Sequence, residues 1–504
     1  MTSSGNRIVP EPLRKLRGLS VPGSSTIFRF LLGCGLVFVC ILVGLMVAVL
    51  PYFFVIAVAA VPIFFLLVAW RLEYGVLAVL ALVSGIVHEA FLPSISFLRA
   101  GDLAFFAVGA ITLASGRKLS KGFQRSEVKL WLVFAAFLLL VPVSVTYAIF
   151  FQQVLPKDAL GEARQLMYLL MFPLTVAVLN TKERVRRFIA GVLVLGVLFS
   201  LGQILQSVFN VPIFGSIGIV SVVQPLNLRS NDVTLSRTGG VNIILFGLFM
   251  VTGRFVIKKI RTVNFLFLSA LLTVGILLTF GRTTWGATLL GMAVVVYLLG
   301  LRGSWPMLIW SMVGASLTLG LLIAVKPTML DALVTRATSV ETEIASGTSV
   351  GWRYYEAGEV VPQIIANPIL GIGLGAAYRR PNAGDLQPES VRYIHSGYLY
   401  ILSKLGVPAL VLLLWYIFVV LSFSWQAAQR DQNPDFRDAH AAICAAIIGI
   451  LLASLAEPHL MTGLSLACIG VLAAITVILK RYAYLPELTE ARTALFRRVP
   501  ARTG

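Results

Sequence analysis

The chain has 504 residues, of which 58% are hydrophobic and only 12% are charged, with a formal net charge of +19. A soluble domain of this size would carry about twice that share of charge, so the composition excludes an ordinary soluble protein. Long apolar runs recur along nearly the whole length and predict an all-α polytopic membrane protein. The basic residues sit in short loops, where they set topology, so the charge does not indicate nucleic-acid binding.

Hydropathy predicts about fourteen membrane helices, with twelve as the lower bound. The predicted spans are roughly 27–49, 51–70, 75–92, 102–115, 129–151, 165–180, 186–208, 238–254, 263–280, 284–301, 305–325, 396–424, 439–456 and 461–479. The run at 102–115 is short for a span of about twenty residues, which predicts a tilted helix, a re-entrant one or an earlier start. All four cysteines lie inside apolar runs without CxxC spacing, so we expect core residues rather than disulfides or metal ligands.

Basic residues cluster in alternate loops, and the positive-inside rule places those loops in the cytoplasm. An even number of spans puts both termini on that side, in agreement with a basic tail at 1–26 and another at 481–504. The loop clusters are Arg117/Lys118/Lys121/Arg125, Lys182/Arg184/Arg186/Arg187 and Arg254/Lys258/Lys259/Arg261.

Two of the segments that face outward are long, at about 210–237 and 326–395. A loop of the second length is usually either functional or disordered. Within it, Trp352, Tyr355, Val360 and Ile364 recur at helical spacing, and Asn367-Pro368 ends the pattern. We expect an ordered amphipathic helix that lies along the membrane surface.

The few basic residues on the outer side are informative because topology does not require them. Arg237 precedes the predicted helix at 238–254, and Arg282 opens the helix at 284–301 in "FGRTTWG". A guanidinium group suits bidentate contact with phosphate or carboxylate, and a helix start favours an anion. The alternative for each arginine is a snorkelling anchor at the interface. Arg353 could similarly reach an anion or end a solvated helix.

His395 stands where the long outer segment enters an apolar helix, in "YIHSGYLYILSKLG". An imidazole there could take a proton from an attacking hydroxyl, or it could be a hydrogen-bonded interface residue. Metal binding is disfavoured because the segment has neither HxxxH nor HExxH spacing. The run "NPILGIGLGAA" lacks the GxGxxG pattern, so it predicts a turn rather than a nucleotide site.

Three segments taken together resemble the O-antigen ligase-related family: "GRTTWGATLLG", "WRYYEAGEVVPQIIANPILGIGLGAA" and "HSGYLYILSKLGVPALVLLL". That family includes O-antigen ligases and O-antigen and exopolysaccharide polymerases. The resemblance covers about 230–425 and implies a catalytic core there, including a periplasmic loop at 326–395. Transmembrane helices at 27–229 and 426–480 flank this core. One departure is Ser396, where the family often has Asn after the histidine.

The resemblance implies a glycosyltransferase C-like bundle in the bacterial inner membrane, with its active site on the periplasmic side. It implies an inverting transfer of a glycan from undecaprenyl diphosphate to an acceptor hydroxyl, without metal, nucleotide or other cofactor. His395 would activate the acceptor, and Arg282 and Arg237 would bind the diphosphate, with Arg229 as the alternative to Arg237. Arg353 and Tyr398 would contact the donor or glycan.

The acceptor remains open between lipid A-core, as for a ligase, and a second lipid-linked glycan, as for a polymerase. A lipid-linked glycan transporter is the main alternative class. It predicts charges buried in mid-helix and repeated halves, and the sequence has no obvious internal repeat and few such charges. A structural scaffold would not explain the long outer segment that ends at His395.

Overall fold

The computed structural model describes residues 68, 71–86, 99–115, 125–209, 214, 216–219, 236–300, 304–345, 349–379, 391–430 and 434–497. The chain divides into two compact units, Met1–Leu67 and Val68–Gly504, and all described residues belong to the second. The predicted helices at 27–49 and 51–70 and the basic tail at 1–26 therefore lie outside the described residues, apart from Val68.

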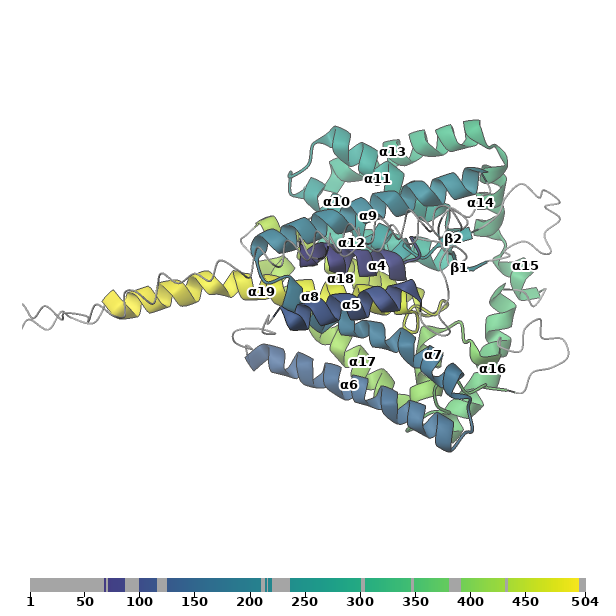
Figure 1. The fold of residues 1–504 in the computed structure, drawn as a ribbon. Coiled ribbons are helices and arrows are strands. Elements are labelled where there is room, and N and C mark those ends of the chain that lie inside the picture. Colours follow the sequence, from purple (N-terminus) through teal and green to yellow (C-terminus); the bar gives the residue numbers. More distant parts are fainter. Residues whose placement is uncertain are drawn as a thin grey trace, which may run out of the picture. The chain divides into compact units, whose positions relative to one another are not determined.

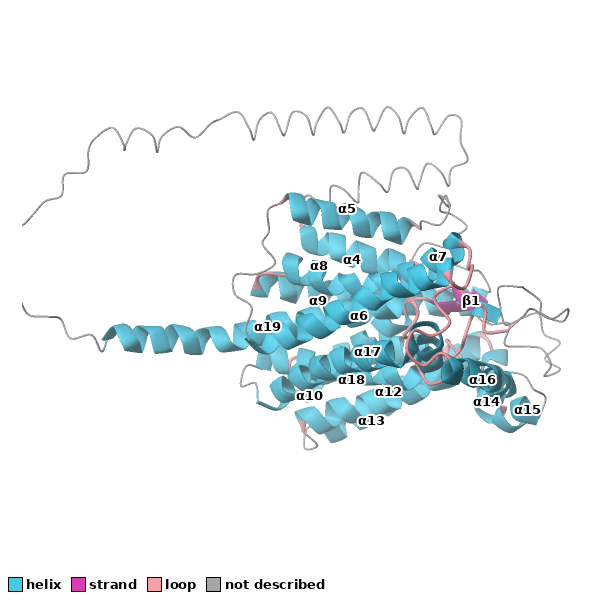
Figure 2. Cartoon of the chain, turned by 90° about the horizontal axis from the view of Figure 1, so that it is seen from below, coloured by secondary structure: helices cyan, strands magenta, loops and turns pink. Residues whose placement is uncertain are grey.

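Helices make up nearly all of the described chain (Figure 2). In chain order the elements are α4 (Leu72–Val83), α5 (Ala100–Ala114), α6 (Arg125–Phe150), α7 (Pro156–Met167), the 3-10 helix η2 (Tyr168–Leu170), α8 (Met171–Val178), α9 (Lys182–Phe209), β1 (Ser216–Ile219), β2 (Ser236–Thr238), α10 (Val241–Val256), α11 (Thr262–Leu277), α12 (Arg282–Leu299), α13 (Ser304–Val325), α14 (Thr328–Thr338), α15 (Val340–Ala345), α16 (Ser349–Ala366), α17 (Gly397–Arg430), α18 (Pro434–Ala453) and α19 (Gly463–Arg497).

Six of the described helices are long and apolar enough to cross a membrane, namely α6, α9, α12, α17, α18 and α19. A seventh candidate is the pair α13–α14, which bends by 120° at its break, and α4, α5, α10 and α11 are shorter apolar helices. The chain is thus an integral membrane protein of the helical class. The predicted count of fourteen spans stays a prediction.

Two details depart from the sequence-based expectation. The described chain is all-α as predicted apart from one short antiparallel ribbon of β1 and β2, in which Ser216 lies opposite Thr238 and Ile219 opposite Ser236. The helix predicted at 165–180 is broken into the end of α7, then η2, then α8. Pro173, in the first turn of α8, has no backbone N–H to continue the hydrogen-bond ladder of the preceding turn.

The helix α19 forms the centre of the bundle, and α6 lies at its edge. In the apolar window of α19, 94% of the residues are buried, against 28% for α6. Gly470 allows α19 to approach α8 closely, since a Cβ there would lie 2.9 Å from the backbone nitrogen of Phe172. The exposed apolar side chains of α6 are what a lipid-facing helix requires.

The two ends of the bundle differ in character. The helices α14, α15 and α16 gather at one end, and the C-terminal part of α19 leaves at the other (Figures 1 and 2). At that second end, buried carboxylates pair with the basic residues of the loop clusters. Arg187 lies 2.9 Å from Glu73, and Lys259 lies 3.4 Å from Asp438.

A bidentate ion pair also fixes this end. Arg481 of α19 donates to both carboxylate oxygens of Glu127 on α6, at 2.9 and 2.6 Å, and Glu127 is fully buried. Removing one partner of such a pair leaves an uncompensated buried charge.

We expect Glu127→Gln to lower the free energy of unfolding by about 3 kcal/mol, because Arg481 loses its counter-charge. Steric-trapping measurements in bicelles would give this value. The double variant Glu127→Gln/Arg481→Gln is the control and should recover most of the loss. A single variant as stable as the wild-type protein would contradict the assignment.

Candidate active site

A cavity of about 400 Å³ opens at the α14–α16 end of the bundle. The start of α12, the C-terminal part of α14, the first half of α16, the start of α17 and the segment after α18 form its walls. Its charged lining residues are Arg282, Arg336, Arg353, Glu356 and Glu457. Three guanidinium groups and two carboxylates thus share one space, with a net excess of positive charge.

Arg282 and Arg336 are linked in the cavity wall by hydrogen bonds from each side chain to the backbone near the other. Arg282 Nη1 lies 3.3 Å from the carbonyl oxygen of Arg336 and 3.3 Å from Ser339 Oγ. In return, Arg336 Nε donates to the carbonyl oxygen of Phe280 at 3.1 Å. Each arginine therefore satisfies a carbonyl at the end of another helix, which fixes both guanidinium groups beside the cavity.

Glu356 of α16 holds His395 from two directions. One carboxylate oxygen accepts the backbone N–H of His395 at 2.8 Å, and the other lies 3.0 Å from its Nδ1. Glu356 is 2% exposed, whereas the His395 side chain is 35% exposed. A carboxylate accepts a hydrogen bond, so Nδ1 carries the ring proton and Nε2 keeps its lone pair. His395 lies beside the cavity, whose lining includes its neighbour Ser396 and its partner Glu356.

The helix α16 forms as the sequence predicts, but its predicted apolar side is only partly buried, since Tyr355 is 45% exposed. Val360 is fully buried, and Glu356 lies on the same face, one helical turn before it. The opposite face is also apolar, with Tyr354 72% exposed and Ile365 74% exposed. The helix therefore turns its one buried carboxylate toward His395 and an apolar stripe outward.

The Gly-x-Gly-x-Gly segment is a turn packed against three helices. Gly371, Gly373 and Gly375 all have positive φ angles, of 66°, 89° and 78°. A Cβ at Gly371 would lie 2.4 Å from the carbonyl oxygen of Ser403 on α17, so only glycine allows this approach. The prediction of a turn here is confirmed, and its contacts position the chain that leads to His395.

A buried charge pair anchors the same turn. Glu162 of α7 accepts the backbone N–H of Gly375 at 2.6 Å and the hydroxyl of Tyr400 at 2.8 Å. The fully buried Lys404 lies 3.4 Å from the other carboxylate oxygen of Glu162 and also donates to the carbonyl oxygen of Ala376. These contacts tie α7, the turn and α17 together behind the cavity.

The remaining predicted site residues are dispersed. Arg353 lines the cavity. The hydroxyl of Tyr398 donates to the carbonyl oxygen of Leu451 at 2.8 Å, which ties α17 to α18. Arg237 belongs to β2, two residues before Gly239-Gly240 and the start of α10, and Arg229 lies outside the described residues.

Two charged residues of the cavity, Glu356 and Arg336, were not predicted from the sequence. Glu356 had a readable signal, since it is a carboxylate on the apolar face of a predicted helix, four residues from both Trp352 and Val360. Arg336 gave no signal of comparable strength. For Glu457 and His459, in "EPHL" after the predicted helix 439–456, the sequence predicts only secondary polar contacts at the outer end of the bundle. In the part of the chain that the structure describes, no group of three or more His, Cys, Asp or Glu side chains is placed to hold a metal ion.

Residues 267–414 match the family model described as O-antigen ligase. This segment, less than a third of the chain, is similar to the O-antigen ligase-related family. The match begins in α11 and ends inside α17. It includes Arg282, Arg336, α16, the glycine turn and His395. The resemblance inferred from the sequence is confirmed over these residues, and the match supports a ligase- or glycosyltransferase-like enzyme of cell-surface polysaccharide biosynthesis. Glu457 lies outside the matched residues. A search of curated proteins gives no match.

We expect Gly371→Ala to prevent stable folding, because the added Cβ would meet backbone atoms of α17 and the φ angle disfavours L-residues. Size-exclusion chromatography in detergent and thermal unfolding would detect the loss. Gly358→Ala is the matched control, since a Cβ there meets nothing within 4 Å and alanine favours the helix α16. Equal behaviour of the two variants would contradict the packing described for the turn.

Proposed function

We propose that this O-antigen ligase-related protein transfers a glycan from undecaprenyl diphosphate to an acceptor hydroxyl at the periplasmic face of the bacterial inner membrane. The observation that carries the proposal is the cavity itself. It brings three arginines together with Glu356, the buried carboxylate that orients His395. The catalytic core is the region 230–425, which includes the segment that matches the family model.

The cavity has the groups that the transfer requires. Arg282, Arg336 and Arg353 would bind the diphosphate, and Arg237 or Arg229 would add a further contact from the segment before α10. Fixed guanidinium groups stabilise the charge that develops on a leaving diphosphate. That stabilisation is the role a divalent metal ion would otherwise have, so the proposed reaction is metal-independent.

His395 would act as the general base through Nε2. It takes the proton of the acceptor hydroxyl as that oxygen attacks the anomeric carbon from the face opposite the diphosphate. The new glycosidic bond forms while the bond to the diphosphate oxygen breaks, and undecaprenyl diphosphate leaves with the electron pair. The displacement inverts the anomeric centre. Glu356 stabilises the histidinium that results, because its carboxylate already lies 3.0 Å from Nδ1.

Lipid A-core is the proposed acceptor, and the second candidate is another lipid-linked glycan, as in a polymerase. Purified protein in liposomes would receive undecaprenyl-diphosphate-linked glycan with and without lipid A-core, and the products would be resolved by size. A single product that requires lipid A-core supports the ligase, and a ladder without it supports the polymerase. Unchanged donor in both conditions would contradict glycan transfer and favour transport.

We expect His395→Ala to abolish transfer and Glu356→Gln to lower kcat by about tenfold to a hundredfold, because the base loses its fixed orientation and counter-charge. Initial rates in the liposome assay would give both values. Glu359→Gln changes the same residue type one helical turn along α16 and should keep near wild-type activity. Full activity of His395→Ala would overturn its role as base.

The proposed orientation can be tested with single cysteines in a chain whose four native cysteines are replaced. We expect Gly358→Cys on α16 to react with a membrane-impermeant maleimide in intact spheroplasts, because the cavity end faces the periplasm. Glu183→Cys, in the basic first turn of α9, should react only after the membrane is opened. The reverse labelling pattern would invert the proposed topology.

A further inference from the structure

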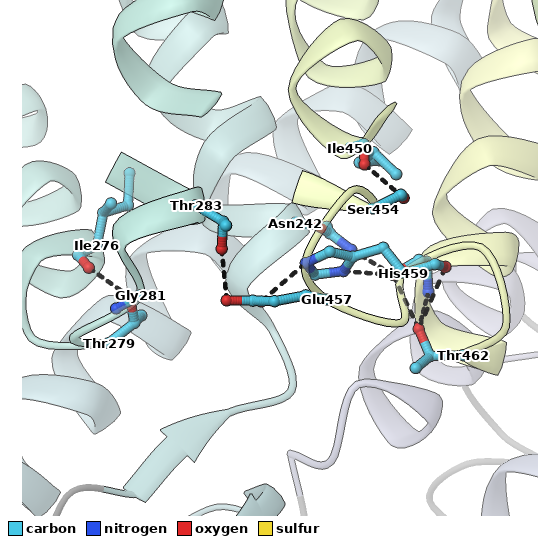
Figure 3. A network of polar contacts seen from close by, with 11 residues as sticks. Asn242, Ile276, Thr279, Gly281, Thr283, Ile450, Ser454, Glu457, His459 and Thr462 are labelled. Atoms are coloured by element: carbon cyan, nitrogen blue, oxygen red, sulfur yellow. Dashed lines mark hydrogen bonds and ion pairs between the residues drawn. The ribbon is translucent and has the colours of Figure 1, made fainter. Parts of the chain in front are cut away.

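A chain of polar contacts leads from the cavity wall into the bundle (Figure 3). Thr283, the residue after Arg282, donates its hydroxyl to Glu457 at 2.5 Å. The second carboxylate oxygen of Glu457 lies 3.2 Å from His459 Nε2, and His459 Nδ1 lies 3.0 Å from Ser465 Oγ. The chain therefore links α12, the segment after α18, and α19.

The contacts of Ser465 and Glu457 together favour one position for the ring proton of His459. Asn242 Nδ2 donates to Ser465 Oγ at 2.8 Å, and the hydroxyl of Thr462 donates to the same oxygen at 2.9 Å. Glu457 presents a carboxylate oxygen to His459 Nε2, and a carboxylate accepts, so Nδ1 is the ring nitrogen left to accept the Ser465 hydroxyl. His459 therefore carries its own proton on Nε2 and donates it to Glu457.

The two histidines near the cavity thus hold opposite tautomers. His395 has its proton on Nδ1, facing Glu356, and keeps a basic Nε2. His459 is 6% exposed, and both of its ring nitrogens face protein groups. It is therefore suited to hold Glu457 in place and not to take a proton from a substrate.

The backbone just before Arg282 explains why this place needs restraint. Phe280 has a φ angle of 52°, a left-handed conformation that a bulky residue rarely adopts. Thr279 holds one side of this turn by donating to the carbonyl oxygen of Ile276 at 2.7 Å (Figure 3). The first turn of α12 has no side-chain cap, and Glu457 holds its other side through Thr283.

We propose that Glu457 is a positioning residue that clamps the first turn of α12 through Thr283 and so keeps Arg282 directed at the diphosphate. His459, Ser465 and Asn242 hold Glu457 in turn. The inference rests on the proposed function for the role of Arg282. It adds a residue outside the segment that matches the family model to the phosphate-binding wall.

A double-mutant cycle on Thr283 and Glu457 tests the clamp. We expect Thr283→Val and Glu457→Leu each to raise KM for the lipid-linked donor by about tenfold, with KM for the acceptor unchanged. The double variant should show about the same tenfold change, because either substitution breaks the same contact. Thr283→Ser keeps the hydroxyl and should restore the wild-type value.

Thr288→Val is the matched control, because its hydroxyl lies on the same helix and donates only to the carbonyl oxygen of Thr284 among the contacts described. Its donor KM should match the wild-type value. Additive changes in the double variant would overturn the clamp, as would a Glu457→Leu loss far larger than that of Thr283→Val. The second result would place Glu457 in direct contact with substrate.

A spectroscopic measurement addresses the same contacts without a substrate. The chain has four histidines, so ¹⁵N-histidine spectra can be assigned by single replacements. We expect the His459 proton on Nε2, and we expect Ser465→Ala and Glu457→Gln to shift the His459 signals while leaving those of His395 unchanged. A proton on Nδ1 of His459 would overturn the clamp. A wild-type protein with this spectrum but no glycan transfer would instead overturn the proposed function.

Discussion

The contact between Glu356 and His395 is the interaction on which the rest of the site depends. It joins two residues 39 positions apart in the chain, and one carboxylate binds both the backbone and the ring of the histidine. A buried carboxylate without a partner would cost several kcal/mol, so α16 is stable in this position only with His395 beside it. The contact fixes α16 against the start of α17, and the cavity lies between them and α12.

Three further charges of the cavity follow the same rule, because each is held by a group from another segment. Arg282 of α12 contacts the end of α14, Arg336 of α14 contacts the turn before α12, and Glu457 contacts Thr283. Charged groups at the end of an apolar bundle cannot rely on water for their full hydration, so mutual pairing determines where they point. Preorganisation of the cavity is therefore a consequence of the pairing that burial requires.

The sequence allowed prediction of the parts of this site that depend on local pattern. Hydropathy and loop charge placed His395 and Arg282 at one end of the bundle, and helical spacing predicted α16. Local pattern could not show that Arg336 would meet the turn before Arg282, because their contact joins segments 56 residues apart. The ribbon of β1 and β2 was missed for a related reason, since its two short strands are stabilised by each other and carry little signal alone.

The two histidines show how the same residue type acquires different chemistry from its neighbours. The carboxylate partner faces Nδ1 in His395 and Nε2 in His459, and the second nitrogen of His459 faces Ser465 instead of the outside. Both histidines stand beside a glutamate at the same end of the bundle, so sequence position would give them similar roles. The two histidines differ in which ring nitrogen contacts the glutamate and in whether the other ring nitrogen also contacts a protein group. A basic lone pair on a partly exposed ring suits proton transfer. A ring whose two nitrogens both form hydrogen bonds to protein groups is suited to hold a neighbouring carboxylate in place.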